Sequence, residues 1–209
     1  MRRVLNAGSG PKTTRKLLPF FGAEAWIEVR MDIDNEVAPD IVGSVTDMAS
    51  VVPSCSFDAV WSSHSLEHLY AHDVPKALSE FKRVLKPDGF ALITCPDLEA
   101  VAALVARKGL DHVAYVSPSG PITALDMLFG HSASIAGGNT YMAHNTGFTC
   151  ASLGRLLVEV GFPIVLAKND AFELWALALM EDVDKTALRL ELRNAGLDMF
   201  DSPDLLDID

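Results

Sequence analysis

The segment Val4-Leu5-Asn6-Ala7-Gly8-Ser9-Gly10-Pro11 joins a short apolar run to a glycine-rich turn. The apolar start predicts a buried β-strand, and Gly8 and Gly10 allow the backbone to turn sharply and to approach a ligand closely. Pro11 suits the first turn of a helix, because its missing N–H needs no partner there, and a short helix is expected over 12–21. A strand, a glycine loop and a helix start predict one βα unit of a parallel sheet.

The alternation of predicted strands and helices continues along the chain. Apolar runs predict further strands, and helices are indicated where apolar residues recur every three to four positions, as they do from Val74 to Val84. We therefore expect a Rossmann-like three-layer α/β/α sandwich, with a mostly parallel sheet and an antiparallel final strand. The expected strands are 26–31, 41–42, 57–61, 90–94, 163–167 and 172–179, and the expected helices are 74–85, 98–108 and 150–160.

Three regions follow from this pattern. Residues 1–180 form one domain, and 110–148 is a partly helical insertion rich in Gly, Ser, Pro and His, which predicts a substrate or lid region. Residues 181–209 are an acidic tail with nine acidic and three basic residues, which is −6 of the formal charge of −11. Residues 187–197 could form a short helix, but their alternating leucines interrupt the apolar stripe that such a helix would show. The hydrophobic residues of the end suggest docking on a second copy of the chain: Met199, Phe200, Leu205, Leu206 and Ile208.

Composition excludes several classes of protein. With 209 residues, 49% of them hydrophobic and 22% charged, the chain is expected to form one ordinary core. It shows no apolar run of membrane-spanning length and no signal peptide. Three widely spaced cysteines favour a reducing, cytoplasmic location and offer no metal cluster. The net charge of −11 argues against nucleic acid as a partner.

Polar residues recur where successive predicted strands end. The glycine loop follows the first strand, Asp32 ends the second, Asp47 follows the third, and Ser62-Ser63-His64 follow the fourth. Ligands of open parallel sheets bind at the carboxyl ends of the strands. Asp32 is placed to accept hydrogen bonds from two ribose hydroxyls, and Asp47 from an adenine amino group. Each position alone is common in ordinary turns, but the ordered set predicts a nucleoside site.

Further motifs accompany these positions: Met31-Asp32-Ile33-Asp34, Gly43-Ser44-Val45-Thr46-Asp47-Met48, Ser63-His64-Ser65-Leu66-Glu67-His68-Leu69 and Arg83-Val84-Leu85-Lys86-Pro87-Asp88-Gly89. With them, the chain resembles the class I S-adenosylmethionine-dependent methyltransferases of the broad small-molecule type, over roughly residues 3 to 180. The resemblance implies S-adenosylmethionine as cofactor, Asp32 at the ribose, and Asp47 with the Met48 backbone at the adenine. It places Gly8, Gly10 and Ser62 at the methionine end. Asn6, Ala7, Ile33 and Ser63 complete the predicted cofactor contacts.

The chain departs from the family pattern at three points. Most members carry an acidic residue where Asn6 stands and a third glycine where Lys12 stands. Asn6 remains able to accept a hydrogen bond from the methionine ammonium. The N-terminal helix that usually closes over the cofactor is missing from the sequence given, so a lid is expected from the insertion or from a partner.

Three other interpretations fit parts of the pattern. His64-Ser65-Leu66-Glu67-His68 matches the H-x-x-E-H pattern of a group of zinc peptidases, but the same residues are typical of methyltransferases here, so no metal is predicted. A nicotinamide-dependent reductase shares the glycine loop and Asp32, yet Thr13 replaces its third glycine. A non-catalytic module that only binds the cofactor is the third alternative.

The resemblance implies transfer of a methyl group to an unidentified small-molecule or glycoconjugate acceptor by in-line displacement. Alignment supplies much of the rate, and a base is needed only if the acceptor must lose a proton. His64 is the best-placed candidate base, followed by His144 and His131 of the insertion. A histidine held by backbone groups for structural reasons is the alternative for each. Four insertion residues are candidate acceptor contacts: Tyr115, Asp126, Tyr141 and Asn145.

Overall fold

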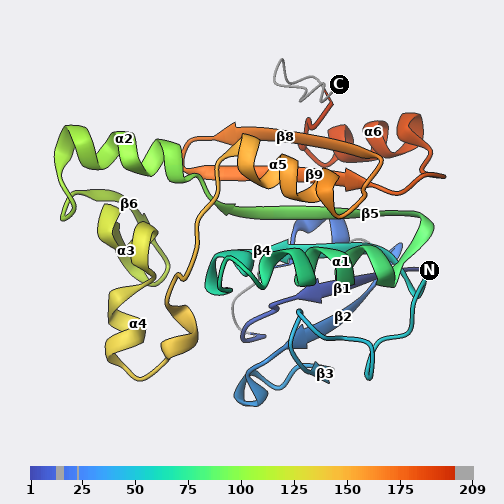
Figure 1. Ribbon diagram of the computed structural model, residues 1–209, viewed down its shortest axis with the longest axis horizontal. Helices are drawn as coiled ribbons and strands as arrows, with labels where there is room; N and C mark the ends of the chain where they lie inside the picture. The colour runs from blue at the N-terminus through green and yellow to red at the C-terminus, as the bar shows by residue number, and fades with distance from the viewer. Residues whose placement is uncertain (13–16, 23, 201–209) are drawn as a thin grey trace.

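A seven-stranded sheet with the strand order β3-β2-β1-β4-β5-β9-β8 is the centre of the molecule (Figure 1). The computed structural model describes residues 1–12, 17–22 and 24–200. Strands β1 to β5 are parallel, and β9 runs antiparallel to both of its neighbours. The strands are β1 Arg2–Ala7, β2 Trp26–Asp32, β3 Ile41–Val42, β4 Phe57–Ser63, β5 Leu85–Pro96, β8 Ile164–Asp170 and β9 Glu173–Leu179.

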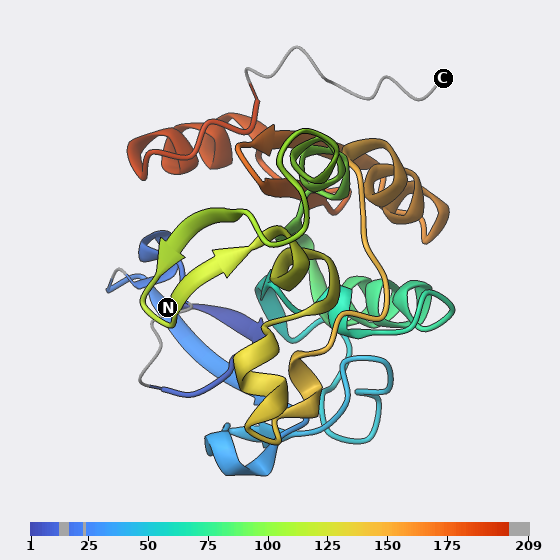
Figure 2. The same ribbon diagram turned by 90° about the vertical axis from the view of Figure 1, so that its left-hand side faces the viewer.

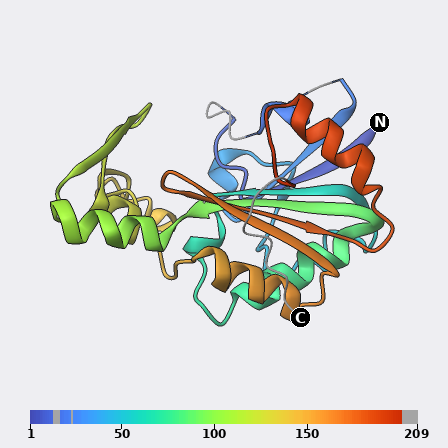
Figure 3. The same ribbon diagram turned by 90° about the horizontal axis from the view of Figure 1, so that it is seen from above.

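Helices cover both faces of this sheet, so the predicted three-layer α/β/α fold is confirmed. Figure 3 shows α1 (Val74–Val84) and α5 (Cys150–Glu159) on one face and α6 (Lys185–Asn194) on the other. Of the helix predicted over 12–21, residues 13–16 lie outside the described residues, and a 3-10 turn, Pro19–Gly22, forms at its end. Strand order reverses at β1, where β2 and β4 lie on opposite sides, and ligands of such sheets bind at that point.

Helix α1 shows how the sequence produces this packing. Its apolar residues recur at helical spacing, and all of them are buried in the core between the helix and the sheet: Val74, Ala77, Leu78, Phe81 and Val84. Asp73 stands at the N-cap of α1, but its side chain accepts no hydrogen bond from the helix backbone, and its carboxylate lies 2.7 Å from the ammonium group of Lys76. Burial of the apolar face, rather than a side-chain cap, therefore holds α1 in place.

The insertion forms a lobe beyond the carboxyl ends of the parallel strands (Figures 1 and 2). The sequence predicted its helices only in outline and missed its β-hairpin. The lobe contains β6 Val113–Ser117, β7 Gly120–Thr123, α3 Ala124–Phe129, α4 Ser132–Ala136 and the 3-10 turn Thr140–Met142. It packs against α2 (Leu98–Lys108) through a small cluster that includes Val101, Leu104 and Met127.

The C-terminal region corrects an expectation. Residues 185–194 form a regular helix, because Leu188 and Leu192 lie one turn apart and are buried against the sheet, while Leu190 is 62% exposed. Met199, predicted to dock on a second copy, is buried in the same cluster of this chain. Residues 205–208 lie outside the described part, so docking through that end stays a prediction.

Two further observations concern the described residues. None of their helices is long and apolar enough to cross a membrane. Cys55, Cys95 and Cys150, all within the described part, form no disulfide with one another.

The packing of α6 generates a test. Leu192→Ala should lower the free energy of unfolding by about 2–5 kcal/mol, because it leaves a cavity in the core. Leu190→Ala, two residues away on the exposed side of the same helix, should change the free energy of unfolding by less than about 0.5 kcal/mol. Urea denaturation of both variants measures the difference, and equal effects would show that α6 is not part of the core.

Candidate active site

The glycine loop is fixed by hydrogen bonds to the end of β2. The backbone N–H groups of Gly8 and Ser9 both donate to the carbonyl oxygen of Met31, at 2.9 and 3.0 Å. The N–H of Gly10 donates to Oδ2 of Asp32, at 2.8 Å. Gly8 has φ +76°, and a Cβ there would collide with the Oγ of Ser65. Only glycine fits at this position, and the loop is held rigidly next to Asp32.

Arg30 is a second support of the loop, and the sequence gave no indication of its role. Its side chain is buried, with 4% exposed. Its guanidinium group donates to the carbonyl oxygens of Gly10, Val37 and Ala38. A buried guanidinium satisfied by three carbonyls joins the glycine loop to the loop after β2. Arg30 and Asp32 are two residues apart on β2, so their side chains leave the strand on the same face.

A cavity of about 270 Å³ opens between these loops. We call it the glycine-loop cavity. It is lined on one side by Gly8, Gly10 and the segment from Asp32 to Asp34, and on another by the segment from Gly43 to Val45. The carboxylate of Asp32 accepts one hydrogen bond from Gly10 and one from the N–H of Asp34. A carboxylate has about four acceptor positions, so two remain for neighbouring hydroxyl groups.

The insertion supplies the opposite wall of the glycine-loop cavity. Residues 139–142 and Asn145 line it, together with His64, Ser65, His68 and Leu69. Asn145 fixes this wall: its N–H donates to the carbonyl oxygen of Glu67 at 2.8 Å, and its side-chain amide donates to that of His68, also at 2.8 Å. Residues of the insertion thus line this cavity, and their action as a lid stays a prediction. Tyr141 and Asn145 are the two predicted acceptor contacts found here.

Several predicted cofactor contacts lie away from this cavity. The side-chain amide of Asn6 donates to Oε1 of Glu28 at 2.6 Å. Ala7 is fully buried, as is Ser62, whose hydroxyl has no hydrogen-bond partner among the described residues. Neither these residues nor Ser63 are among those that line the cavity. Of the ten predicted contacts, Gly8, Gly10, Asp32 and Ile33 line it.

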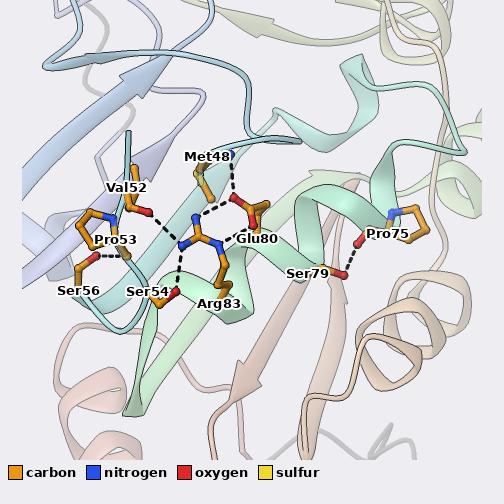
Figure 4. Close-up of polar contacts among 9 residues, drawn as sticks. All are labelled: Met48, Val52, Pro53, Ser54, Ser56, Pro75, Ser79, Glu80 and Arg83. Atoms are coloured by element: carbon orange, nitrogen blue, oxygen red, sulfur yellow. Dashed lines mark hydrogen bonds and ion pairs between the residues drawn. The ribbon is translucent and has the colours of Figure 1, made fainter. Parts of the chain in front are cut away.

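The predicted adenine contacts, Asp47 and Met48, are placed differently from the expectation. The N–H of Met48 donates to Oε2 of Glu80 at 2.7 Å, and Glu80 is paired with Arg83, which also donates to the Val52 carbonyl (Figure 4). The Met48 amide therefore already has a partner within the chain. Asp47 is exposed and lies outside the cavity lining. Glu80 belongs to α1, so its hydrogen bond with Met48 is a tertiary contact, which no local sequence pattern predicts.

His64, the first candidate base, is held between two carboxylates. Its Nδ1 lies 3.3 Å from Oε1 of Glu67, and its Nε2 lies 3.5 Å from Oε1 of Glu173. Burial opposes the charge on the ring, but the contacts with Glu173 and Glu67 outweigh it and raise the pKa of His64 to about 9. The ring therefore carries a proton at neutral pH. It suits stabilisation of negative charge and does not suit acceptance of a proton.

His144, the second candidate, lines a different cavity of about 320 Å³. We call it the insertion cavity. Its walls are mainly apolar and include Leu98, Val101 and Phe129, with Glu67 at its inner side. Nδ1 of His144 lies 3.0 Å from the carbonyl oxygen of Met127. Burial lowers the pKa of His144, so its ring is neutral near pH 7.

The other candidates of the insertion have structural roles. Asp126 accepts hydrogen bonds from Thr123 and Ser132 and caps α3. His131 contacts Ser134, and Tyr115 lies on the β6 strand of the hairpin. None of the three is among the residues that line the two cavities.

The H-x-x-E-H motif does not have the geometry of the zinc peptidases. Those enzymes need both histidines on one helix, four residues apart. Here His64 has a left-handed backbone with φ 47°, and only Leu66–His68 form a single 3-10 turn. The motif is part of the loop after β4, so the peptidase interpretation is rejected.

The chain was compared with known proteins by sequence and by structure. The sequence profile of the methyltransferase domain family matches residues 5–93. No curated protein matches the sequence. A possible histamine N-methyltransferase from Thermotoga maritima has a similar structure, with a TM-score of 0.58 and 13% identity over 87% of this chain and 83% of that one. The 1,6-didemethyltoxoflavin-N1-methyltransferase of Burkholderia thailandensis, solved with S-adenosylhomocysteine, has a TM-score of 0.54 and 14% identity, over 87% and 72%. At these identities the structural likeness establishes the fold.

The matched segment runs from the glycine loop through β5, and so contains most of the glycine-loop cavity. Over residues 5–93 the chain is similar to the methyltransferase domain family, and its fold is that of S-adenosylmethionine-dependent methyltransferases.

The site predicts the effect of one exchange. Asp32→Ala should weaken binding of S-adenosylhomocysteine about 10- to 100-fold, because the hydrogen bonds that its carboxylate offers to ribose hydroxyls are lost. Glu36→Ala, an exposed acidic residue of the following turn, should leave binding unchanged. Isothermal titration calorimetry compares the two, and an unaltered Kd for Asp32→Ala would contradict the assignment.

Proposed function

We propose that the chain transfers the methyl group of S-adenosylmethionine to a small molecule that binds in the insertion cavity. One observation carries this proposal: two cavities lie on either side of the turn Glu67–His68. Gly8, Gly10, Asp32 and His68 line the glycine-loop cavity, while Glu67 and His144 line the insertion cavity. Asn145 lines both.

The residues of the glycine-loop cavity fit the methyl donor. Asp32 has free acceptor positions for the two ribose hydroxyls. The side chains of Ile33 and Val37 offer apolar contacts beside it, which suit the flat face of an adenine. Tyr141, 56% exposed, lies in the insertion wall and would cover the bound donor.

The insertion cavity indicates the chemistry of the acceptor. Its apolar side chains suit a compact, largely apolar molecule, and a few polar groups at its inner side would orient it. A glycoconjugate, the broader alternative, would require more hydrogen-bonding groups than these walls offer. We therefore favour a small molecule with one nucleophilic O, N or S atom.

The reaction is a direct displacement. The electron pair of the acceptor forms a bond to the methyl carbon while the carbon–sulfur bond breaks, and its electrons go to sulfur to give S-adenosylhomocysteine. The protein positions the two reactants on either side of the turn and excludes water. His64, as a cation, would stabilise negative charge nearby. The three cysteines, none in a disulfide, fit the proposed cytoplasmic location.

The proposal is tested by filling one cavity at a time. Leu98→Trp should place an indole ring in the insertion cavity and abolish transfer of tritiated methyl groups to a small-molecule extract of cells. Binding of S-adenosylhomocysteine should persist, because the glycine-loop cavity is untouched. Ala102→Trp, on the exposed side of the same helix, should retain transfer. Loss of transfer in both variants, or in neither, would contradict the assignment of the acceptor cavity.

The alternative function, a nicotinamide-dependent reductase, predicts a different binding result. If NADH binds the wild-type chain more tightly than S-adenosylhomocysteine does in the same calorimeter, the methyltransferase proposal is wrong. We expect S-adenosylhomocysteine to bind and NADH to give no measurable heat.

A further inference from the structure

Three side chains with metal-binding groups converge at the boundary between the two cavities. They are Glu67 and His68 of the 3-10 turn after β4 and His144 of the insertion. A carboxylate oxygen of Glu67 and one ring nitrogen of each histidine all lie within 4.8 Å of one another. The fold brings them together from two distant segments.

Both histidines are oriented by backbone carbonyl groups. Nδ1 of His68 lies 3.1 Å from the carbonyl oxygen of Ala143, and Nδ1 of His144 lies 3.0 Å from that of Met127. A carbonyl oxygen only accepts, so each Nδ1 must carry the hydrogen. In the neutral ring, each Nε2 then keeps its lone pair. Histidines that bind metals are commonly held in this way, with the second nitrogen donating to a carbonyl or carboxylate.

Glu67 is the most unusual of the three. Its side chain is 1% exposed, and neither carboxylate oxygen accepts a hydrogen bond from the described residues. Its ion pair with His64 involves one oxygen, Oε1, at 3.3 Å. A buried carboxylate without hydrogen bonds is costly. His64 provides a charged partner to Oε1 only, and a bound cation would provide one to Oε2.

We propose that Glu67, His68 and His144 bind one divalent transition-metal ion, with Zn²⁺ the best match to two imidazoles and a carboxylate. In a tetrahedral zinc site the ligand atoms are roughly 3.4 Å apart. The three ligand atoms therefore need to approach one another by at most about 1.4 Å. His144 belongs to the insertion, outside the sheet.

This site differs from the one that the H-x-x-E-H motif suggested. The motif would use His64 as the third ligand, but His64 faces Glu67 and Glu173 and is held by both. His144 takes that place, from a part of the sequence that no motif links to Glu67. The donor set leaves at least one coordination position for an outside ligand.

The place of the site suggests its use. Glu67 and His144 line the insertion cavity, and His68 lines the glycine-loop cavity. An ion between them would bind an oxygen or nitrogen atom of the acceptor and favour loss of its proton. This use rests on the proposed methyltransferase function, whereas binding of the ion does not.

The test is a titration with the metal alone. The full chain, stripped with a chelator and returned to chelator-free buffer, is titrated with CoCl₂ followed by visible absorption, and with ZnCl₂ in a calorimeter. We expect one ion per chain, with the absorption bands of a four- or five-coordinate Co²⁺ site. Glu67→Gln, His68→Ala and His144→Ala should each weaken binding at least tenfold.

Two control variants exclude surface binding. His131→Ala removes another insertion histidine, and Cys55→Ser removes an exposed thiol; both should bind Co²⁺ as the wild type does. Absence of stoichiometric binding by the wild type, or unchanged binding by His144→Ala, would overturn the proposal. If Glu67→Gln fails to fold, His144→Ala still decides, because His144 lies outside the core of the sheet.

Titration of the same samples with S-adenosylhomocysteine separates the two proposals. Loss of cofactor binding by the wild type with intact Co²⁺ binding would reject the methyltransferase function and retain the metal site. Cofactor binding without metal binding would retain the methyltransferase function and reject the metal site. His144 would then be a base that acts without a metal ion.

Discussion

The carbonyl oxygen of Glu67 holds the two halves of the site together. It accepts hydrogen bonds from the N–H groups of Asn145 and Thr146, at 2.8 and 3.2 Å. These bonds, with that from the Asn145 side chain to His68, attach the insertion to the loop after β4. The packing of the insertion against α2 is a second attachment. Both cavities, and the approach of His144 to His68, depend on these attachments.

The electrostatics of the same turn follow from its burial. Glu67 is enclosed, and burial raises its pKa, but the contacts with His64 outweigh this effect and the pKa is lowered. His64 therefore stays protonated and Glu67 stays ionised. The pair brings a fixed cation to the edge of the glycine-loop cavity, while His144 stays neutral on the other side. The glycine-loop cavity is thus lined by a protonated His64, whereas the insertion cavity is lined by an ionised Glu67 and a neutral His144.

The sheet could be predicted from the sequence because each strand is a local apolar run, and because β1, the glycine loop and Asp32 follow one another closely. Gly8, Gly10, Asp32 and Ile33 line the cavity for the same reason: adjacent strand ends meet at one edge of a parallel sheet. The hairpin of the insertion was not predictable, because its strands are largely exposed on both faces and show no period of two. In α6 the alternating leucines concealed the i, i+4 pair Leu188 and Leu192.

The remaining differences come from contacts between distant segments. Met48 and Asp47 stand where adenine contacts were expected, yet Glu80 from α1 takes the Met48 amide. Asn6 is turned toward Glu28 on the neighbouring strand. The role of Arg30 and the cavity wall formed by residues 139–142 depend on contacts between loops that are distant in the sequence. Sequence spacing locates a residue along one element and does not reveal which side chain from another element will reach it.

The proposed place of the methyl donor is between Asp32 and the insertion. A crystal structure of the chain with S-adenosylhomocysteine tests it most directly. We expect density in the glycine-loop cavity, with the ribose hydroxyls on the carboxylate of Asp32 and with Tyr141 over the nucleoside. Density for the nucleoside elsewhere, or in contact with Asp32 but with the insertion swung away from residues 67–68, would contradict it.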